Sequence, residues 1–443
     1  MKKEFKLRPY QEDAVRAAEE TDLKRILLVL STGMGKSYII AELGRRNLHQ
    51  HILVFQPNKE ILEQNVEKFK LATGKRPAIL SASKKSWELG KVTFSTIGTA
   101  KNRMQEIAKL GVDLIILDEA QEYPVNSADS MISKLLDEID FQGKVIGLTA
   151  TPFITYSGDL RREGLTKDGT RTKFSKEVCL DVLTNNNPFG FKETFWQDIL
   201  YNTSISDSFE KGFLIKPNYR LWQPSSEIME KASRLLKPTQ DRQSFTEAST
   251  KEFDNYMANV YRAYAEKVCD KHKRSVVFVR TVEIAEKLAS EVKGGYCIST
   301  HTKAKEREEI LEKFKQDSDE HLVIFNVSVL GRGFDSPNCE AVAFFTPTRS
   351  LIRYMQFVGR CLRPDPNNPE KQAFVYDFDL TNRKGESNST LRRFGKVEDI
   401  HLRKNLFGNW EIFSSSKNEI LSGEVVTVNF SVEFKPRWKK KKK

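Results

Sequence analysis

Short apolar runs rich in Val, Ile and Leu alternate with segments of helical periodicity in two parts of the chain. In the first part these runs cover residues 25–30, 51–56, 92–96, 114–120 and 144–151. In the second part they cover residues 275–281, 296–300, 321–327, 341–347 and 373–379. The runs are continuous rather than alternating, which is typical of parallel strands covered by helices on both faces. The pattern predicts an α/β fold with two parallel-sheet domains.

The segments outside these two parts have a different pattern of polar and apolar residues. Residues 153–215 are polar and have little periodicity, a helical stretch is expected at about 226–272, and a strand pair is expected near 410–434. The predicted organisation is a first domain at 1–152, an insertion or linker at 153–215, a second domain at 216–385 and a C-terminal extension with a lysine-rich tail at 386–443.

A chain of 443 residues is too long for one hydrophobic core, which agrees with several units. It contains no run of about 18 apolar residues, so the sequence predicts no membrane span. The N-terminal segment MKKEFKLRPYQ has no apolar region behind its basic residues and does not resemble a secretory signal. We therefore expect a cytoplasmic protein, located in the host cytoplasm if it is viral.

Cysteine usage argues against two classes of site. The cysteines are far apart, form no C-x-x-C pair, and stand at Cys179, Cys269, Cys297, Cys339 and Cys361. Neither a zinc site nor a disulfide framework fits this spacing, whereas buried free thiols do.

The formal net charge of +12 favours a polyanionic partner such as nucleic acid. More than half of that charge lies on the seven basic residues of the final segment 435–443. This tail either adds nonspecific affinity for DNA or is a solvated terminus, so charge alone decides little.

A phosphate-binding loop is predicted directly after the first apolar run. Residues 31–37 read Ser-Thr-Gly-Met-Gly-Lys-Ser, and a helical pattern follows them. Glycines in such a loop let backbone N–H groups converge on phosphate oxygens at a helix N-terminus. Leu30 stands where the G-x-x-x-x-G-K-[ST] pattern has its first glycine, and the plain alternative is a glycine-rich turn. The predicted nucleotide-binding residues of the loop are Thr32, Gly33, Gly35, Lys36 and Ser37.

Two adjacent carboxylates follow the apolar run 114–120, at the strand end where α/β sheets place their ligands. Asp118 is expected to hold Mg²⁺ together with the Ser37 hydroxyl. Glu119 is expected to orient or deprotonate an attacking water. The alternative, a solvated helix cap, is disfavoured by the phosphate loop upstream. The predicted cofactors are therefore ATP and Mg²⁺.

At this point the chain resembles helicase superfamily 2, whose second motif is Asp-Glu-x-x and reads Asp118-Glu119-Ala120-Gln121 here. The resemblance extends through most of residues 5–365 in the order of the family's motifs. It implies two RecA-like P-loop NTPase domains that close around one ATP, with an insertion after the first domain and a short basic C-terminal extension.

The resemblance also implies roles for individual residues. Catalytic roles fall on Lys36, Asp118, Glu119, Gln121, Arg360 and Arg363. Nucleotide contacts beyond the phosphate loop fall on Arg8, Gln11, Gly333, Asp335 and Gln356, with Gln11 reading the adenine edge. Nucleic-acid contacts fall on Pro57, Asn58, Ser95, Thr96, Thr281 and Ser328. The segment Thr149-Ala150-Thr151 is similar to the motif that couples ATP hydrolysis to movement.

Arg360 and Arg363 are three residues apart, which predicts that they share one face of a helix at 356–363. A cation inserted from the second domain would stabilise the charge on the transferred phosphoryl group. We expect Arg363 to be this arginine finger and Arg360 its neighbour at the γ-phosphate, with the reverse assignment open. The alternative is a solvated arginine pair.

The polar insertion contains a basic hairpin candidate. Asp168-Gly169 is a turn signal, and basic residues surround it at Arg161, Arg162, Lys167, Arg171 and Lys173. Arg161, Arg162 and Arg171 either contact DNA, as a wedge at a duplex junction, or lie on a solvated surface. The aromatic residues Phe189, Phe191 and Trp196 either stack on bases or anchor a loop to a core.

The leading functional hypothesis is an ATP-dependent DNA helicase or translocase. Its compact form resembles phage helicases that act by branch migration on forks and Holliday junctions in replication and recombination. The expected partner is single-stranded and branched duplex DNA, and the expected state is a monomer. The alternatives are an RNA helicase and the duplex-translocating motor of a restriction-type system. The tetrad Asp-Glu-Ala-Gln differs from the forms commonest in RNA enzymes, which favours DNA.

Overall fold

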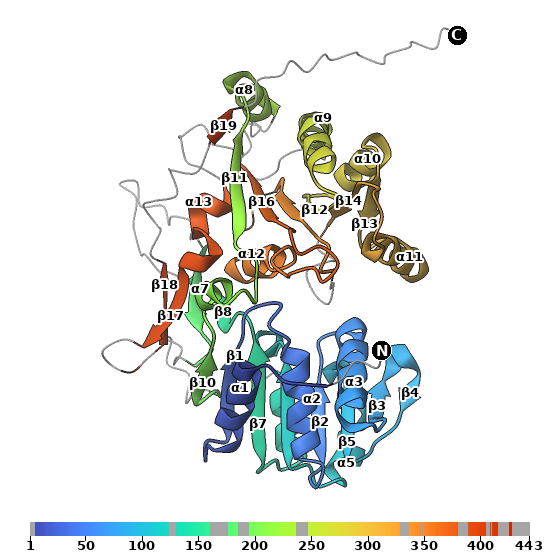
Figure 1. The fold of residues 1–443 in the computed structure, drawn as a ribbon, viewed down its shortest axis with the longest axis vertical. Helices are drawn as coiled ribbons and strands as arrows, with labels where there is room; N and C mark the ends of the chain where they lie inside the picture. Colours follow the sequence, from blue (N-terminus) through green and yellow to red (C-terminus); the bar gives the residue numbers. More distant parts are fainter. Residues whose placement is uncertain are drawn as a thin grey trace, which may run out of the picture. The chain divides into compact units, whose positions relative to one another are not determined.

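The computed structural model in Figure 1 forms two compact units. The first contains the chain up to Leu214 together with Glu398–Ser414, and the second contains most of the remainder from Ile215 onward. The described residues are 5–123, 130–159, 176–184, 195–235, 247–327, 336–346, 348, 350–379, 389–404, 408, 410–414 and 425–427.

The first unit is built on a mostly parallel sheet with the strand order β10-β1-β7-β6-β2-β5-β3-β4. Its strands are β1 (Arg25–Val29), β2 (Ile52–Phe55), β3 (Ala78–Ser81), β4 (Ser86–Trp87), β5 (Val92–Ser95), β6 (Leu114–Asp118), β7 (Lys144–Thr149) and β10 (Asp198–Asn202). Among the described strands of this sheet, only β3 and β4 pair antiparallel. The apolar runs predicted five of these strands, and the two-domain α/β expectation is confirmed. Strands β3, β4 and β10 were not predicted.

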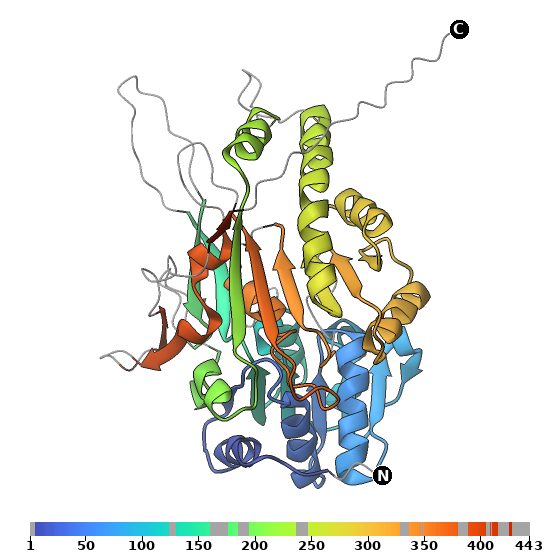
Figure 2. The same cartoon turned by 45° about the horizontal axis from the view of Figure 1, so that its top comes forward.

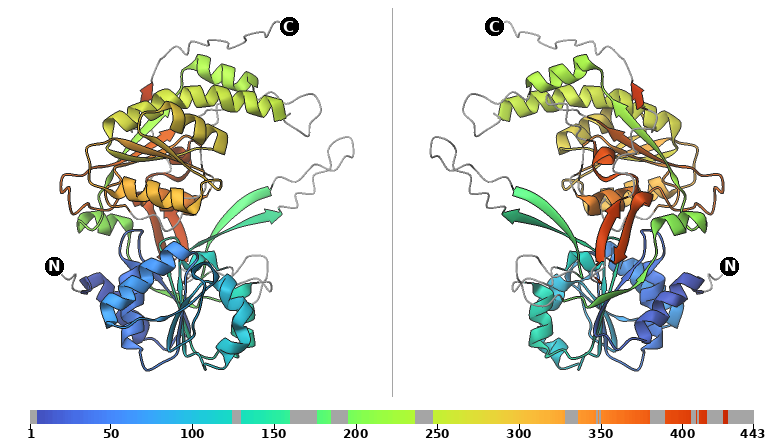
Figure 3. Two further views of the ribbon diagram at one scale, coloured as in Figure 1. Left: turned by 90° about the vertical axis from the view of Figure 1, so that its right-hand side faces the viewer. Right: turned by 90° about the vertical axis from the view of Figure 1, so that its left-hand side faces the viewer.

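Helices cover both faces of this sheet, as Figure 3 shows in side view. One face contacts α1 (Pro9–Glu19), α2 (Lys36–Arg46) and α3 (Lys59–Thr73). The other face packs against α4 (Ile97–Ala100), α5 (Met104–Ala108) and α6 (Met131–Glu138) through a shared apolar cluster. Burial on both faces explains why the strands are continuous apolar runs.

The first unit continues past the predicted end of the first domain at residue 152. Strand β10 pairs with β1, and the short helix α7 (Ile205–Glu210) follows it. Trp196, just before β10, is fully buried, and a Cβ on Gly147 would lie 2.5 Å from its ring. Of the two readings for Trp196, the core anchor is therefore correct.

An antiparallel ribbon leaves the first sheet after β7. Strands β8 (Phe153–Asp159) and β9 (Lys176–Val182) pair with Asp159 opposite Lys176. The turn predicted at Asp168-Gly169 falls between these two strands in the sequence and lies outside the described residues. Phe189 and Phe191 also lie outside the described residues.

The second unit is built on a parallel sheet with the strand order β13-β14-β12-β15-β16-β11-β19. Its strands are β11 (Pro217–Gln223), β12 (Arg274–Phe278), β13 (Gly295–Ile298), β14 (Leu322–Asn326), β15 (Ala341–Phe344), β16 (Ala373–Phe378) and β19 (Val425–Thr427). The five predicted runs of the second part correspond to β12 to β16. Strand β11 was not predicted.

Helices also cover both faces of the second sheet. Helices α8 (Ser226–Leu235), α9 (Glu247–Lys271) and α10 (Val282–Glu291) pack on one face, and Figure 2 shows α9 running along it. On the other face Phe357 of α12 (Leu351–Val358) stacks on Phe278 with ring centroids 3.7 Å apart. The described part of this unit also contains α11 (Ala304–Lys315) and α13 (Thr390–Phe394).

The C-terminal extension corrects the strand pair predicted near 410–434. Strand β18 (Trp410–Ser414) pairs with β17 (Ile400–Lys404) and belongs to the first unit, whereas β19 joins the second sheet beside β11. The Trp410 indole N–H donates to Asp198 at 2.7 Å, and Lys404 pairs with the same carboxylate at 2.9 Å. These side-chain contacts across about 200 positions leave no local sequence signal.

No helix among the described residues is long and apolar enough to cross a membrane. The thiols of Cys269, Cys297, Cys339 and Cys361 are free, and burial raises the pKa of each.

Candidate active site

The predicted phosphate loop lies at the carboxyl edge of the first sheet, between β1 and α2. Gly33 and Gly35 have φ values of 93° and 74°, in the left-handed region that glycine adopts without strain. A Cβ on Gly35 would lie 2.6 Å from the side-chain nitrogen of Gln11. Gly35 is therefore required both for the turn and for the approach of α1, and Lys36 begins helix α2.

Helix α1 holds this loop from one side. The Gln11 amide donates to the Met34 carbonyl at 3.0 Å, and the Tyr10 hydroxyl donates to the same oxygen at 2.9 Å. The Gln11 side-chain oxygen accepts the Arg8 backbone N–H, and the Arg8 guanidinium lies over the Phe213 ring. Gln11, predicted to read the adenine edge, and Arg8, predicted to contact the nucleotide, thus lie beside the loop.

A network of polar side chains connects the phosphate loop to the end of β7 along the carboxyl edge of the first sheet. The Lys36 ammonium pairs with the Glu119 carboxylate at 3.2 Å, and the Gln121 amide donates to that carboxylate at 2.8 Å. The Thr149 hydroxyl donates to the Gln121 side-chain oxygen and accepts the Thr151 backbone N–H at 2.9 Å. Residues of three separate predicted motifs therefore form one network.

Asp118 is the most buried carboxylate of this edge, with 4% of its surface exposed. Burial, reinforced by the charge of Glu119, raises the pKa of Asp118 to about 6, while Lys36 and Asn65 oppose the shift. Glu119 has a left-handed φ of 55°, which is strained for a residue with a side chain. The edge thus concentrates negative charge and strain at one point.

Asn65 is a site residue that sequence reasoning missed. It is 1% exposed on α3, and its amide donates to the Asp118 carboxylate at 2.7 Å. The signal was present, because the buried stripe of α3 reads Ile61, Leu62, Asn65, Val66 and Phe69. A polar residue in the middle of an apolar stripe indicates a buried partner.

The donor set at this edge suits Mg²⁺ with a nucleotide. Asp118 supplies carboxylate oxygen, and burial leaves that carboxylate in need of a positive charge. Mg²⁺ in such sites uses one or two protein oxygens together with substrate phosphates rather than a full protein cage. Among the described residues, no group of three or more His, Cys, Asp or Glu could hold a metal by itself.

The predicted nucleic-acid residues of the first unit follow β2 and β5 at the same edge. Asn58, next to Pro57, caps α3 by accepting the Ile61 N–H at 2.9 Å. Ser95 is fully buried, and its hydroxyl donates to the Leu80 carbonyl at 2.8 Å. Its side chain is therefore occupied inside the protein, and Thr96 is the more accessible residue of that pair.

In the second unit the structure corrects the expected arginine helix. Helix α12 contains the buried Gln356 but ends at Val358, so Arg360 and Arg363 follow it in a turn rather than sharing a helix face. Pro364 disfavours helical conformation at Arg363, the residue before it, so a helix through Arg363 is not expected. Arg360 is 9% exposed. Thr281 follows β12 and caps α10 by accepting the Ile284 N–H.

Several predicted site residues lie outside the described part of the chain. They are Arg161, Arg162, Arg171, Ser328, Gly333 and Asp335.

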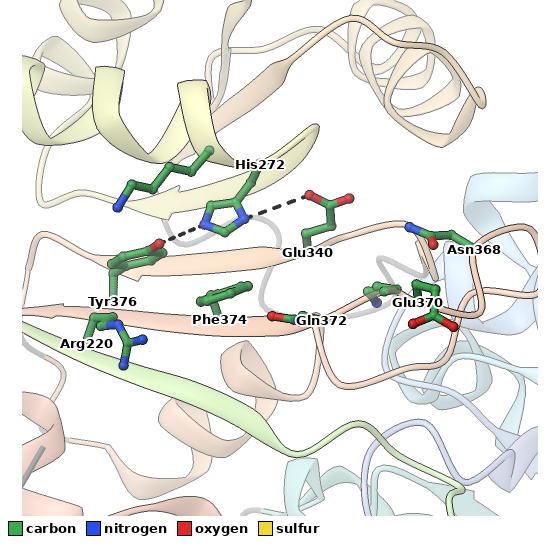
Figure 4. A pocket seen from close by; sticks show the side chains of 10 residues that line it. Arg220, His272, Glu340, Asn368, Glu370, Gln372, Phe374 and Tyr376 are labelled. Atoms are coloured by element: carbon green, nitrogen blue, oxygen red, sulfur yellow. Dashed lines mark hydrogen bonds and ion pairs between the residues drawn. The ribbon is translucent and has the colours of Figure 1, made fainter. Parts of the chain in front are cut away.

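A separate cavity of about 480 Å³ lies in the second unit, at the edge where the parallel strands of its sheet begin (Figure 4). We call this edge the amino edge of the second sheet. His272 and Tyr376 line it and form a hydrogen bond of 2.7 Å, with Glu340 3.8 Å from the other ring nitrogen. Burial lowers the pKa of His272 to about 4, so the ring is neutral near pH 7. None of the predicted motif residues lines this cavity.

Comparisons with known families agree with this arrangement. Residues 4–154 match the model described as "Type III restriction enzyme, res subunit", and residues 260–365 match "Helicase conserved C-terminal domain". Among solved structures, the Type ISP restriction-modification enzyme LlaBIII bound to DNA is similar over 84% of this chain and 28% of its own, with TM-score 0.58 and 17% identity. The Hef helicase domain of Pyrococcus furiosus is similar over 84% of this chain and 95% of its own, with TM-score 0.51 and 18% identity.

Sequence relatives come from viruses and yeast. "Putative helicase 22" of Sulfolobus islandicus filamentous virus is 22% identical over 85% of this chain and 66% of its own length. "Putative ATP-dependent helicase IRC3" of Saccharomyces cerevisiae is 24% identical over 84% and 51%. The "51.5 kDa protein" of a Lactococcus phage is 23% identical over 75% and 61%. The chain thus spans between 51% and 66% of these relatives.

The order of the two family models follows the order of the two α/β units, and the network from Lys36 to Thr151 connects the motifs of the first unit. The two α/β sheets also agree with the fold of the similar solved structures. The chain therefore belongs to helicase superfamily 2.

Proposed function

We propose that this protein is an ATP-driven DNA motor that hydrolyses ATP at the carboxyl edge of the first sheet. The observation that carries the proposal is the continuous network from the phosphate loop through Glu119 and Gln121 to Thr149. Such a network links the group that meets the γ-phosphate to the segment after β7. A site built only to bind nucleotide has no need of this connection.

Within this proposal each side chain has a distinct role. Lys36 neutralises phosphate charge, and Glu119 accepts a proton from the attacking water. Asp118 and Ser37 hold Mg²⁺, which supplies positive charge to the phosphate oxygens when bound. Lys36 pairs with Glu119 at 3.2 Å. Phosphates that bind Lys36 would compete with this carboxylate and release it.

Gln121 and Thr149 would transmit the outcome of hydrolysis. A change in the position of the Glu119 carboxylate alters its bond with the Gln121 amide, and Gln121 is held in turn by Thr149. Thr149 also accepts the N–H of Thr151, which lies two residues before the start of ribbon β8–β9. The network therefore ends close to the ribbon along the chain.

Arg360 and Arg363 of the second unit are proposed to complete the site as arginine fingers. A guanidinium group placed at the γ-phosphate stabilises the spread charge of the transition state. In this proposal the two units close around ATP and separate after hydrolysis, which is the conformational change that drives movement.

For the substrate we propose single-stranded and branched duplex DNA, remodelled at forks or four-way junctions in replication and recombination by a monomer. The relatives named as helicases support the motor activity on which this assignment rests. The basic residues around 161–173 and the lysine-rich tail would add affinity for phosphates. RNA is the alternative substrate, and the Asp-Glu-Ala-Gln tetrad disfavours it.

A second candidate function is translocation on duplex DNA without strand separation. The match of residues 4–154 to a restriction-enzyme subunit model favours it, as does the similarity to a DNA-bound restriction-modification enzyme. In that case the protein would displace a third strand or a bound protein from duplex DNA.

The deciding experiment measures ATP turnover and strand displacement with single-stranded DNA, duplex, fork, four-way junction and RNA of matched sequence. We expect branched DNA to give the highest turnover and to be unwound. Turnover stimulated by plain duplex, with triplex displacement and no unwinding, would favour the second candidate. Stimulation by RNA far above DNA would contradict the DNA assignment.

The control is Lys36→Ala, matched by Lys70→Ala on the exposed side of α3. We expect Lys36→Ala to lose turnover on every substrate while it still binds DNA, and Lys70→Ala to behave as wild type. Continued turnover in Lys36→Ala would contradict the proposed hydrolytic site.

A further inference from the structure

One exposed aromatic side chain lies on the outermost strand of the first sheet. Trp87 on β4 is 49% exposed, whereas Trp196 and Trp222 are buried. The exposed part of the Trp87 indole ring offers apolar area that a stacked ligand could bury.

The strand register places Trp87 at the same sheet edge as the active site. Strand β3 is parallel to β5, with Leu80 opposite Ser95, and β4 pairs Trp87 with Leu80. The residues that follow β2 and β5 are the predicted nucleic-acid contacts. Trp87 therefore continues that row by two further strands, and the row from β2 to β4 spans about 14 Å at the usual strand spacing.

Hydrogen bonds tie the turn before β4 to the predicted contact at Thr96. The Ala82 backbone N–H donates to the Thr99 hydroxyl at 3.2 Å, and the Thr96 and Thr99 hydroxyls are 3.0 Å apart. The turn is also joined to α3, because Lys84 pairs with Glu63. The three loops after β2, β5 and β3 therefore form one supported surface.

One basic side chain contacts the exposed ring, and two more precede it in the chain. Lys84 and Lys85 stand in the turn, and both residues are exposed. The Arg103 guanidinium lies over the Trp87 ring, 5.4 Å from its centroid, while also pairing with Glu106. We call Lys84, Lys85, Trp87 and Arg103 the outer edge patch.

Resting on the proposed function, we infer that the outer edge patch is a stacking platform for a base of single-stranded nucleic acid. An aromatic face beside lysine and arginine is the combination that binds a single strand, since bases stack on the ring while phosphates meet the cations. Stacking on Trp87 holds the nucleic-acid strand that runs past Thr96. It keeps this nucleic-acid strand from sliding back between hydrolysis cycles. The ring accepts any base, so the platform adds affinity without sequence preference.

The test compares binding of a fluorescein-labelled oligodeoxythymidylate by wild type, Trp87→Ala, Trp87→Phe and Met131→Ala. Met131 on α6 is the matched control, because it is the other large apolar side chain found exposed among the described residues, at 39%. We expect Trp87→Ala to weaken binding on the order of ten-fold and Trp87→Phe to retain most affinity. Met131→Ala should bind as wild type, and ATP turnover without nucleic acid should be unchanged in all four proteins.

Salt dependence separates stacking from charge. Removing a stacked ring leaves the slope of log K against log salt unchanged, whereas Lys85→Ala should reduce it by about 0.7 for a single strand. Equal binding by Trp87→Ala and wild type would overturn the inference while leaving the proposed function intact. So would a loss of affinity in Trp87→Ala that disappears at high salt. Failure of the wild type to bind any nucleic acid would overturn the proposed function and this inference together.

Discussion

Two clusters of buried polar side chains lie at the edges of the two sheets, and their chemistry differs. At the carboxyl edge of the first sheet, Asp118 is buried with a raised pKa and Glu119 has a strained backbone. At the amino edge of the second sheet, Arg274 is 2% exposed and its guanidinium reaches the carbonyls of residues 314, 316 and 320 and the Ser318 hydroxyl.

The two clusters differ in whether protein groups compensate the buried charge, and this distinguishes a ligand-binding site from a structural network. In the Arg274 cluster the acceptors around the buried charge belong to the protein, so the cluster stabilises the fold by itself. In the Asp118 cluster two adjacent carboxylates face one lysine, and an excess of negative charge remains. That excess is what a divalent cation with a nucleotide would neutralise.

The largest effect should come from Asp118→Asn, which removes the charge but keeps the size of the side chain. We expect ATP turnover to fall at least about 100-fold, since a proposed metal contact is lost. Unfolding in urea without Mg²⁺ should show unchanged or increased stability near pH 8, because a buried, poorly compensated carboxylate is gone. A large loss of stability would mean that Asp118 is structural and would remove the contrast between the clusters.

Arg274→Met should lower stability strongly and leave ATP turnover nearly unchanged, which is the opposite of Asp118→Asn. We expect it to lower the free energy of unfolding by about 3–5 kcal/mol, because several buried carbonyls lose their charged donor. Turnover per folded molecule should remain near wild type. The measurement is urea unfolding combined with turnover normalised to the folded fraction, and a selective loss of turnover would contradict a purely structural role.

The next largest effect concerns the support of the site. Asn65→Leu removes the amide that donates to Asp118 while keeping a side chain of similar size. We expect turnover or Mg²⁺ affinity to fall about 10–100-fold, as for other residues that orient a metal ligand. Asn47→Leu is the matched control, because the half-buried Asn47 caps the end of α2 and its amide donates to the Leu43 carbonyl at 2.9 Å. Equal effects of the two changes on turnover would show that Asn65 has no special role.

The smallest effect is a pH dependence of stability at His272, which lines the cavity at the amino edge of the second sheet. Burial lowers the pKa of His272 from 6.5 to about 4, so the folded state binds fewer protons than the unfolded state within this window. This contribution is therefore present above pH 6.5 and is lost as pH falls towards 4, by about 1–2 kcal/mol at pH 5. His272→Gln should flatten the stability profile between pH 8 and pH 5, and an unchanged profile would assign the acid loss to other groups.

The sequence predicted the strands that are buried on both faces, because their apolar runs are continuous. It missed β4, a two-residue edge strand, and β11, in which buried and exposed positions alternate at the start. It also missed the return of residues 398–414 to the first unit, which depends on contacts such as that of Trp410 with Asp198. Contacts of that range have no local pattern.

The site residues were also predicted where they belong to a local sequence motif and missed where they do not. Residues in contiguous motifs, such as Lys36 and Glu119, were identified in advance, and the structure brings them together. Asn65 lies between motifs on a helix, and only its place in an apolar stripe marked it. The expected helix through Arg363 was wrong because spacing alone does not show where α12 ends.

The most direct test of the central claim is steady-state ATP turnover of Glu119→Gln with saturating nucleic acid, measured beside the binding of a fluorescent ATP analogue. Gln keeps the shape of Glu119 and removes the carboxylate that is proposed to accept the proton from water. The account predicts nucleotide binding within about ten-fold of wild type and turnover reduced at least about 100-fold. Turnover close to wild type would contradict hydrolysis at this edge of the sheet.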